Sequence, residues 1–142
     1  MPNRCGVFRI DRVVAHKSQR MMHLLSGESV VRSYRVALGR DPVGHKEREG
    51  DGRTPEGRYT IDRRNPNSKY HLSLHISYPG PADVERARSL GVDPGGDIMI
   101  HGLKAGVDHP SDWTQGCIAV TNAEMEEIWG MVADGTPIEI LP

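Results

Sequence analysis

The sequence predicts a single, mainly β domain of mixed β-sheets, sandwich-like or barrel-like, with two short helices. Its 142 residues make one domain of ordinary size. The apolar runs are four or five residues long, which is the length of a strand rather than of a helix. The chain also contains 16 glycines and 10 prolines, above average usage, and most of them fall between these runs and mark turns.

Three short strands with tight connections are expected first, at residues 13–15, 21–25 and 30–38, where they form an antiparallel meander. Residues 39–58 then combine five glycines with many charges and have almost no apolar content. This composition predicts a long loop. Loops of this length inside a compact domain are usually functional or disordered.

The middle of the chain predicts two strands and a helix. A strand is expected at residues 59–62, followed by a turn at residues 65–68, where the sequence is Asn-Pro-Asn-Ser. Residues 71–78 alternate apolar and polar side chains, which predicts a strand with a polar face and an apolar face. Residues 82–90 are expected to form a short helix that ends at Gly91.

The last third predicts three strands and the second helix. Strands are expected at residues 97–101, 117–120 and 138–141. Thr121 and Glu124 have the spacing of a capping box at a helix N-terminus. The helix that follows has one apolar stripe at helical spacing, formed by Met125, Ile128, Trp129 and Val132.

Composition argues against several classes of protein. Eighteen Lys and Arg against nineteen Asp and Glu give a net charge of −1, so nucleic acid is not expected as a partner. No run of about 18 apolar residues is present, and no membrane-spanning helix is expected. The first residues lack the apolar core of a signal peptide. Two cysteines, Cys5 and Cys117, allow one disulfide but not a disulfide framework.

Cys117 is the leading candidate for catalysis. It follows Gly116 where a polar loop meets an apolar strand, and glycine lets the backbone approach a substrate closely. Amide N–H groups at such a bend can stabilise an oxyanion. A thiol needs a base to become a nucleophile at neutral pH, and His101 is the natural candidate. A buried structural cysteine and a core histidine explain the same spacing equally well.

Two segments carry a family resemblance. His101-Gly102 is followed by the sequence Thr-Gln-Gly-Cys-Ile at residues 114–118, with Asn122 downstream. Residues 50–59 contain the pattern Thr-Pro-x-Gly-x-aromatic. In this order they resemble the L,D-transpeptidase catalytic domain of the YkuD type, in a divergent subgroup. The resemblance extends over about residues 10–141 and implies a YkuD-like fold for the whole chain, residues 1–142, as one catalytic domain.

The sequence departs from the family pattern at two positions. Gln115 stands where the family has a histidine just before Gly-Cys, so only His101 carries over as the base. Ala119 stands where many members have an arginine that recognises the donor's carboxylate. Both departures concern recognition of the substrate rather than the chemistry.

The resemblance implies a cysteine acyltransferase that acts on peptidoglycan stem peptides in cell-wall biogenesis. Cys117 would attack the carbonyl of an L,D-peptide bond and form a thioester, with His101 as the base and the N–H groups of Gly116 and Cys117 as the oxyanion hole. No metal or cofactor is expected. Carbapenem-type β-lactams are expected as covalent inhibitors. The substrate implies the periplasm or cell envelope as the location.

Five further residues are candidates for substrate binding: Arg53, His75, Trp113, Thr114 and Gln115. The guanidinium of Arg53 suits a substrate carboxylate, although a solvated loop explains it equally well. His75 either lines the cleft or belongs to a half-exposed strand face. Trp113 either stacks on the substrate or fills the core.

Two other functions remain as alternatives. A peptidoglycan L,D-carboxypeptidase or amidase would pass the same acyl-enzyme to water, and sequence does not distinguish it from a transferase. A zinc-binding module would use His101, His109 and Cys117, together with His75, although their spacing matches no paired zinc signature. Cys5 lies outside the family-like region, and we expect it to be dispensable.

Overall fold

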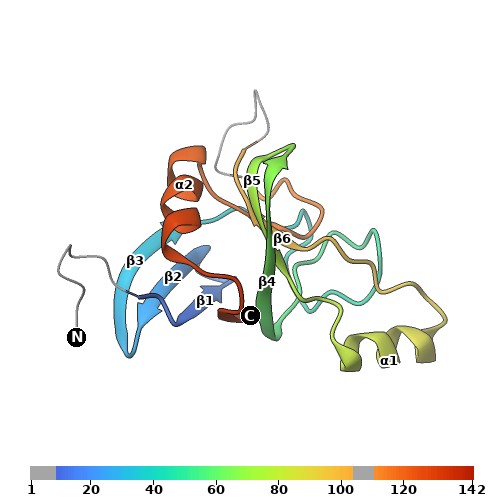
Figure 1. Cartoon of the computed structure of the whole chain (residues 1–142). Helices are drawn as coiled ribbons and strands as arrows, with labels where there is room; N and C mark the ends of the chain where they lie inside the picture. Colours follow the sequence, from blue (N-terminus) through green and yellow to red (C-terminus); the bar gives the residue numbers. More distant parts are fainter. Residues whose placement is uncertain (1–8, 104–110) are drawn as a thin grey trace.

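The computed structural model describes residues 9–103 and 111–142. This part of the chain contains eight strands and two helices of ten residues each. The strands form the body of the molecule, one helix packs on it and the other projects at one end (Figure 1). The prediction of one small, mainly β domain with two short helices is confirmed.

The N-terminal meander forms as predicted. Its strands β1 (Arg12–His16), β2 (Met21–Ser26) and β3 (Ser29–Arg35) pair antiparallel in sequence order. Alternate side chains, among them those of Met22 and Leu24, are fully buried. The period of two therefore places one face of the meander against the core.

The expectation of a turn at residues 65–68 is wrong, because β4 (Gly57–Ser68) continues through them and pairs antiparallel with β5 (His71–Ile76). The pairing is irregular between Asn65 and Ser68. Pro66, which has no N–H to donate, therefore sits at a bulge where the sheet needs no donor. The chain reverses just after this bulge, so the hairpin projects further than the sequence predicts.

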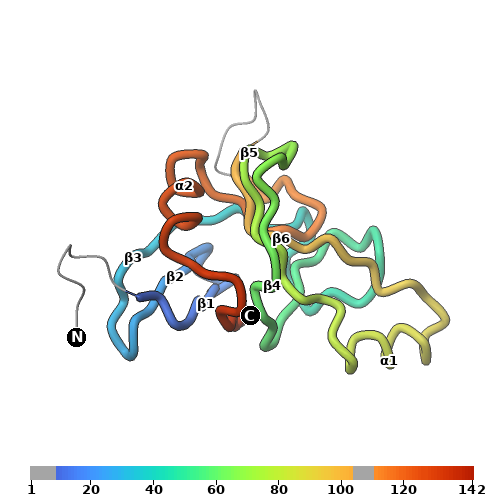
Figure 2. Tube along the Cα trace, in the orientation of Figure 1, coloured from blue at the N-terminus to red at the C-terminus, as the bar shows by residue number. Residues whose placement is uncertain are grey.

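The first helix and the long loop lie together. Helix α1 (Pro81–Leu90) ends as predicted at Gly91, which adopts the left-handed conformation with φ 69°. The segment after α1 returns beside the loop that precedes β4, and the Glu49 N–H donates to the Asp93 carbonyl at 2.8 Å. Figure 2 shows these two segments side by side between β6 (Met99–His101) and α1.

The second helix begins as predicted. The Thr121 side chain accepts from the Glu124 N–H and the Glu124 side chain accepts from the Thr121 N–H, so the capping box forms at the start of α2 (Asn122–Met131). The short strand β7 (Ile118–Ala119) precedes it, and β8 (Pro137–Leu141) follows it.

At the C-terminal end of α2, a cation from the sheet binds the free backbone carbonyls. Arg64 of β4 donates to the carbonyls of Trp129 and Val132 at 3.1 and 2.5 Å and pairs with Asp134 at 2.9 Å. Its guanidinium lies 4.6 Å from the centre of the Trp129 ring. A positive charge at the helix C-terminus satisfies carbonyls that have no partner in the helix. This contact fixes α2 against the hairpin.

All strands join one mixed sheet in the order β3-β2-β1-β8-β4-β5-β6-β7, with β1–β8 and β6–β7 parallel. The two edges of this sheet are linked. Ala37, two residues beyond β3, exchanges two backbone hydrogen bonds of 2.9 Å with Ala119 of β7. The sheet therefore curls back on itself, as expected for a barrel-like fold, and encloses the core.

The core is aliphatic. Its largest fully buried side chains include those of Leu38, Ile61, Leu74, Ile100 and Ile118. They come from β4 to β7 and from the link between the edges of the sheet, and Met22 and Leu24 of β2 add fully buried side chains from the other half. Neither helix in the described part of the chain is long and apolar enough to cross a membrane.

Candidate active site

A pocket of about 680 Å³ brings together the two residues that the sequence predicts as catalytic, His101 and Cys117. Its walls come from three places that are distant in sequence: the β4–β5 hairpin, the strand β6 with the residues before it, and the turn that leads into β7. Trp113, Thr114 and Gln115 lie in that turn and also line the pocket.

The turn before Cys117 is held by Thr114. Its hydroxyl donates to the Cys117 carbonyl at 2.8 Å and accepts from the Gly116 N–H at 3.1 Å. Gly116 has a φ of 142°, and a Cβ at this position would lie 2.7 Å from the Arg53 carbonyl oxygen. Only glycine fits here. The long loop thus presses directly on the turn that carries the thiol.

The Gly116 N–H already has an acceptor, the Thr114 hydroxyl. Of the two amides that the family resemblance assigns to the oxyanion hole, this one is therefore engaged within the turn. The Cys117 amide is the other member of that expected pair.

The surroundings of the Cys117 side chain favour the protonated thiol over the thiolate. It is half-buried, and its Sγ–H donates to the Asp97 carbonyl at 3.2 Å. Burial raises the pKa of Cys117 to about 11. Asp97 has a φ of 54°, which directs its carbonyl toward Cys117. At neutral pH the thiol keeps its proton and requires a base.

His101 is suited to be that base. It ends β6, is only 2% exposed, and its Nδ1 lies 2.6 Å from the Gly102 carbonyl oxygen. A carbonyl only accepts, so Nδ1 carries the proton and Nε2 keeps its lone pair. Burial lowers the pKa of His101. The imidazole is therefore neutral near pH 7, with one nitrogen able to accept a proton.

Aromatic rings fix the orientation of the imidazole. Tyr70, at the tip of the β4–β5 hairpin, stacks on His101 with ring centroids 4.3 Å apart and planes 19° apart. Trp113 approaches both rings, at 5.8 and 5.7 Å. The Trp113 indole N–H is buried and has no hydrogen-bond partner among the described residues. These contacts place Trp113 in the pocket wall beside His101.

The backbone after His101 is anchored on both sides. The Gly102 N–H donates to the Tyr70 carbonyl at 2.9 Å, and a Cβ on Gly102 would approach the same carbonyl to 2.8 Å. Asn122, at the start of α2, accepts from the Leu103 N–H at 2.8 Å. The His-Gly pair is thus held between the hairpin and α2.

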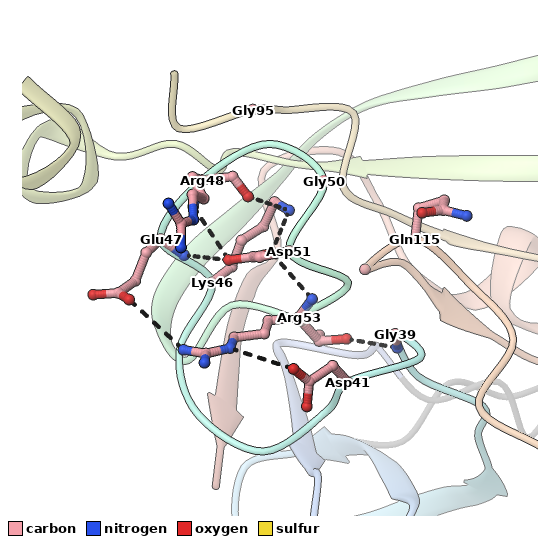
Figure 3. A network of polar contacts seen from close by, with 12 residues as sticks. Gly39, Asp41, Lys46, Glu47, Arg48, Gly50, Asp51, Arg53, Gly95 and Gln115 are labelled. Carbon is pink, nitrogen blue, oxygen red and sulfur yellow. Dashed lines mark hydrogen bonds and ion pairs between the residues drawn. The ribbon is translucent and has the colours of Figure 1, made fainter. Parts of the chain in front are cut away.

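Two predicted substrate-binding residues do not line the pocket. His75 pairs with Asp62 at 2.6 Å across the β4–β5 pair. The Arg53 guanidinium lies 4.0 Å from Asp41 and 3.7 Å from Glu47, within the polar network of the long loop (Figure 3). Arg53 contacts the site through its backbone carbonyl, which packs against Gly116.

The long loop is organised around a buried ion pair. Lys46 is 3% exposed and contacts Asp51 at 3.0 Å. Asp51 also accepts from three backbone N–H groups, those of Glu47, Arg48 and Arg53 (Figure 3). Burial acts to raise the pKa of Asp51, but these hydrogen bonds outweigh it and lower the pKa to about 2. These contacts hold the loop in place where the Arg53 carbonyl packs against Gly116.

Cys117 and Asp97 also border a second pocket of about 300 Å³ between this loop and the segment at residues 95–98. Gln115 lies between the two pockets and lines both. Arg40 donates to the Gln115 side-chain oxygen and to the Gly50 carbonyl. The side chain that replaces the family's second histidine is therefore held by a cation from the loop.

Sequence reasoning missed Tyr70, Asp97 and Arg40. The expected turn at residues 65–68 hid the true hairpin tip, where Tyr70 lies. Asp97 contributes a carbonyl through an unusual φ, which sequence does not indicate. Arg40 follows Gly39, which packs closely on Gly52 and Gly116; the glycines of the long loop were the available signal.

The zinc alternative gains no support from the described residues. In residues 9–103 and 111–142, no three His, Cys, Asp or Glu side chains form a group that could hold a metal ion. His109 and Cys5 lie outside the described residues.

Comparison with known proteins agrees with the motifs. The family model for the YkuD L,D-transpeptidase catalytic domain matches residues 10–140. YafK of Escherichia coli (strain K12), which is named as an L,D-transpeptidase, is 32% identical over 102 residues. This match covers 70% of the chain and 36% of YafK, so the chain spans about a third of that relative's length.

Solved structures share the fold. The helical cell shape determining protein Pgp2 from Campylobacter jejuni superposes with a TM-score of 0.74 at 23% identity, over 94% of this chain and 48% of Pgp2. The carbamoyl enzyme that Ldtfm forms with avibactam gives a TM-score of 0.65 at 16% identity, over 95% of this chain and 50% of that one. The chain therefore belongs to the YkuD family of L,D-transpeptidase catalytic domains.

Proposed function

We propose that this chain is a cysteine acyltransferase that acts on peptidoglycan stem peptides through a thioester on Cys117. Membership of the YkuD family supports a transpeptidase-type function on peptidoglycan. The observation that carries the finer proposal is the pairing of His101 with Cys117 in one pocket. The contact of His101 Nδ1 with the Gly102 carbonyl leaves Nε2 free to accept a proton in the pocket that Cys117 also lines.

Each step moves one proton through His101. Nε2 accepts the Sγ proton as sulfur attacks the L,D-peptide carbonyl, and the tetrahedral intermediate forms. The C–N bond then breaks, the leaving amine takes the proton back from His101, and the thioester remains. An acceptor amine attacks the thioester while His101 accepts its proton, and the thiol leaves and regains that proton.

The pKa values favour a concerted first step. The raised pKa of Cys117 and the lowered pKa of His101 make a resting thiolate–imidazolium pair unfavourable. Proton transfer therefore accompanies attack on the carbonyl rather than preceding it. A substrate that fills the pocket also excludes water from the developing negative charge.

The test is mass spectrometry of the products that the purified protein forms from muropeptides, with and without an added amine acceptor. New amide products support the transferase. Trimmed stem peptides alone, with no amide formed, support the hydrolase that uses the same acyl-enzyme. No products, or products that persist in Cys117→Ala, would overturn the proposal.

We also propose that the chain acts in the periplasm or cell envelope, where stem peptides are found. The support is the family, whose members act on peptidoglycan. Cell fractionation with an antibody to the protein tests this. Recovery in the cytoplasmic fraction alone would contradict it.

A further inference from the structure

The pocket lacks the carboxylate-binding residue that the family resemblance leads one to expect. Ala119 stands at that position, and it is fully buried in β7. Its amide and carbonyl both pair with Ala37. A long cationic side chain has no room there, so β7 offers no positive charge to a substrate.

The β4–β5 hairpin supplies a different cation. Lys69, at its tip, is exposed and lines the pocket with His101 and Cys117. Among the described residues that line this pocket it is the one Lys or Arg, and no ion pair or hydrogen bond with another described residue engages its ammonium. A cation that lines such a pocket and has no partner among the described residues is available to an anionic ligand.

Other cations near the site are already committed to the protein. The ammonium of Lys46 is buried and pairs with Asp51. The guanidinium of Arg53 lies between Asp41 and Glu47. These contacts belong to the long loop (Figure 3), and the buried Lys46 cannot leave Asp51 without a cost in stability.

The direction of proton transfer indicates which end of the substrate lies near Lys69. His101 must return its proton to the leaving nitrogen, so the leaving residue occupies the part of the pocket beside the imidazole. Tyr70 stacks on that imidazole, and Lys69 precedes it in the chain. We propose that Lys69 binds the α-carboxylate of the residue that leaves as the thioester forms. This proposal rests on the proposed function and names the specificity of the same site.

The experiment uses two muropeptides that differ only in the leaving residue, which has a free carboxylate in one and a primary carboxamide in the other. Initial rates give kcat/KM for wild type, Lys69→Gln, Lys69→Arg and Arg63→Gln. Arg63 is an exposed cation on the same hairpin that does not line the pocket. Its variant changes the net charge as Lys69→Gln does and serves as the matched control.

Wild type and Arg63→Gln are expected to prefer the carboxylate by about tenfold, as for a charge-assisted contact in a partly solvated site. Lys69→Gln should lose this preference by slowing on the carboxylate substrate alone, and Lys69→Arg should keep most of it. An unchanged preference in Lys69→Gln would overturn the assignment while leaving the acyl transfer intact. Failure of wild type to process either substrate would overturn both proposals.

Discussion

The ring of Tyr70 lies flat on the imidazole of His101, 4.3 Å away between centroids. The Tyr70 carbonyl also accepts the Gly102 N–H at 2.9 Å, so one hairpin residue holds both the ring and the backbone of the proposed base. The stack excludes water from one face of the imidazole and so contributes to the burial that lowers its pKa. The tip of the β4–β5 hairpin therefore helps to position the proposed base.

Replacing Tyr70 should impair catalysis through His101. In Tyr70→Ala the imidazole loses its stacking partner and gains water, so kcat is expected to fall about fivefold, in line with a contact of about 1 kcal/mol. The pKa of His101 should rise toward its ordinary value, which moves the acid limb of the pH–rate profile to higher pH. Tyr70→Phe keeps the ring and should match wild type. An unshifted acid limb in Tyr70→Ala would contradict this role.

The lowered pKa of His101 determines how activity and stability should depend on pH below neutrality. Activity needs neutral His101, whose pKa is lowered, so activity should persist below pH ~6.5 and be lost only as the pH falls through that lowered value. The unfolded chain takes up the proton first, so the free energy of unfolding should also decrease as the pH falls below ~6.5. In His101→Gln the pH dependence of the free energy of unfolding should weaken in this range, and the remainder is expected from His23, whose pKa is also lowered by burial.

The Cys117 thiol should titrate far above an ordinary cysteine. In a Cys5→Ser variant, which leaves a single thiol, the thiolate absorbance should appear with a midpoint of about 11. Slow alkylation at neutral pH is the accompanying expectation. A thiolate already present at pH 7 would show a resting ion pair with His101 and contradict the concerted first step.

Gly116→Ala tests the contact between the long loop and the nucleophile turn. The new methyl would lie 2.7 Å from the Arg53 carbonyl, at a φ that other residues avoid. We expect a loss of about 1–3 kcal/mol in the free energy of unfolding, together with a strong loss of activity. A methyl on Gly130 of α2 would instead point into open space, with no packed neighbour within 4 Å. Gly130→Ala should therefore be neutral or stabilise the helix by up to about 1 kcal/mol. Equal stability of the two variants would contradict the contact.

Arg64→Ala tests the anchor of α2. It removes two hydrogen bonds to helix carbonyls, the pair with Asp134 and the contact with the Trp129 ring. The expected loss is about 1–3 kcal/mol in chemical denaturation, with little change in activity of the folded fraction. The neighbouring exposed Arg63→Ala should stay within about 0.5 kcal/mol of wild type. A smaller effect at Arg64 than at Arg63 would show that α2 is held in another way.

Local patterns predicted the elements that local physics determines. The capping box of Thr121 and Glu124 and the left-handed cap at Gly91 depend on neighbouring residues, and both form as predicted. The prediction of a turn at the Asn-Pro-Asn-Ser segment was wrong, because pairing with β5 overrides the turn propensity of these residues. This pairing tolerates Pro66 at a bulge.

The candidate site shows the same contrast between residues recognised from local sequence and contacts made by distant segments. His101 and Cys117 were recognisable because their motifs are contiguous in sequence, and they meet in one pocket. The stack of Tyr70, the carbonyl of Asp97 and the contact of Arg40 with Gln115 arise from segments that only the curled sheet brings together. Sequence spacing alone does not show which residues such contacts join.

Covalent trapping by a carbapenem is the sharpest test of the nucleophile. The thiolate formed during attack opens the strained β-lactam carbonyl; the ring C–N bond breaks, its nitrogen takes the proton from His101, and a thioester to Cys117 forms. Intact-protein mass spectrometry should show one added drug mass, located by digestion on the peptide that contains Cys117.

The adduct should be absent in Cys117→Ala and form much more slowly in His101→Ala, while Cys5→Ser behaves as wild type. A simple half-buried thiol with a pKa of about 11 and no base beside it would react slowly with any such carbonyl. Labelling at Cys5, or equal labelling of folded and unfolded protein, would therefore exclude an activated Cys117.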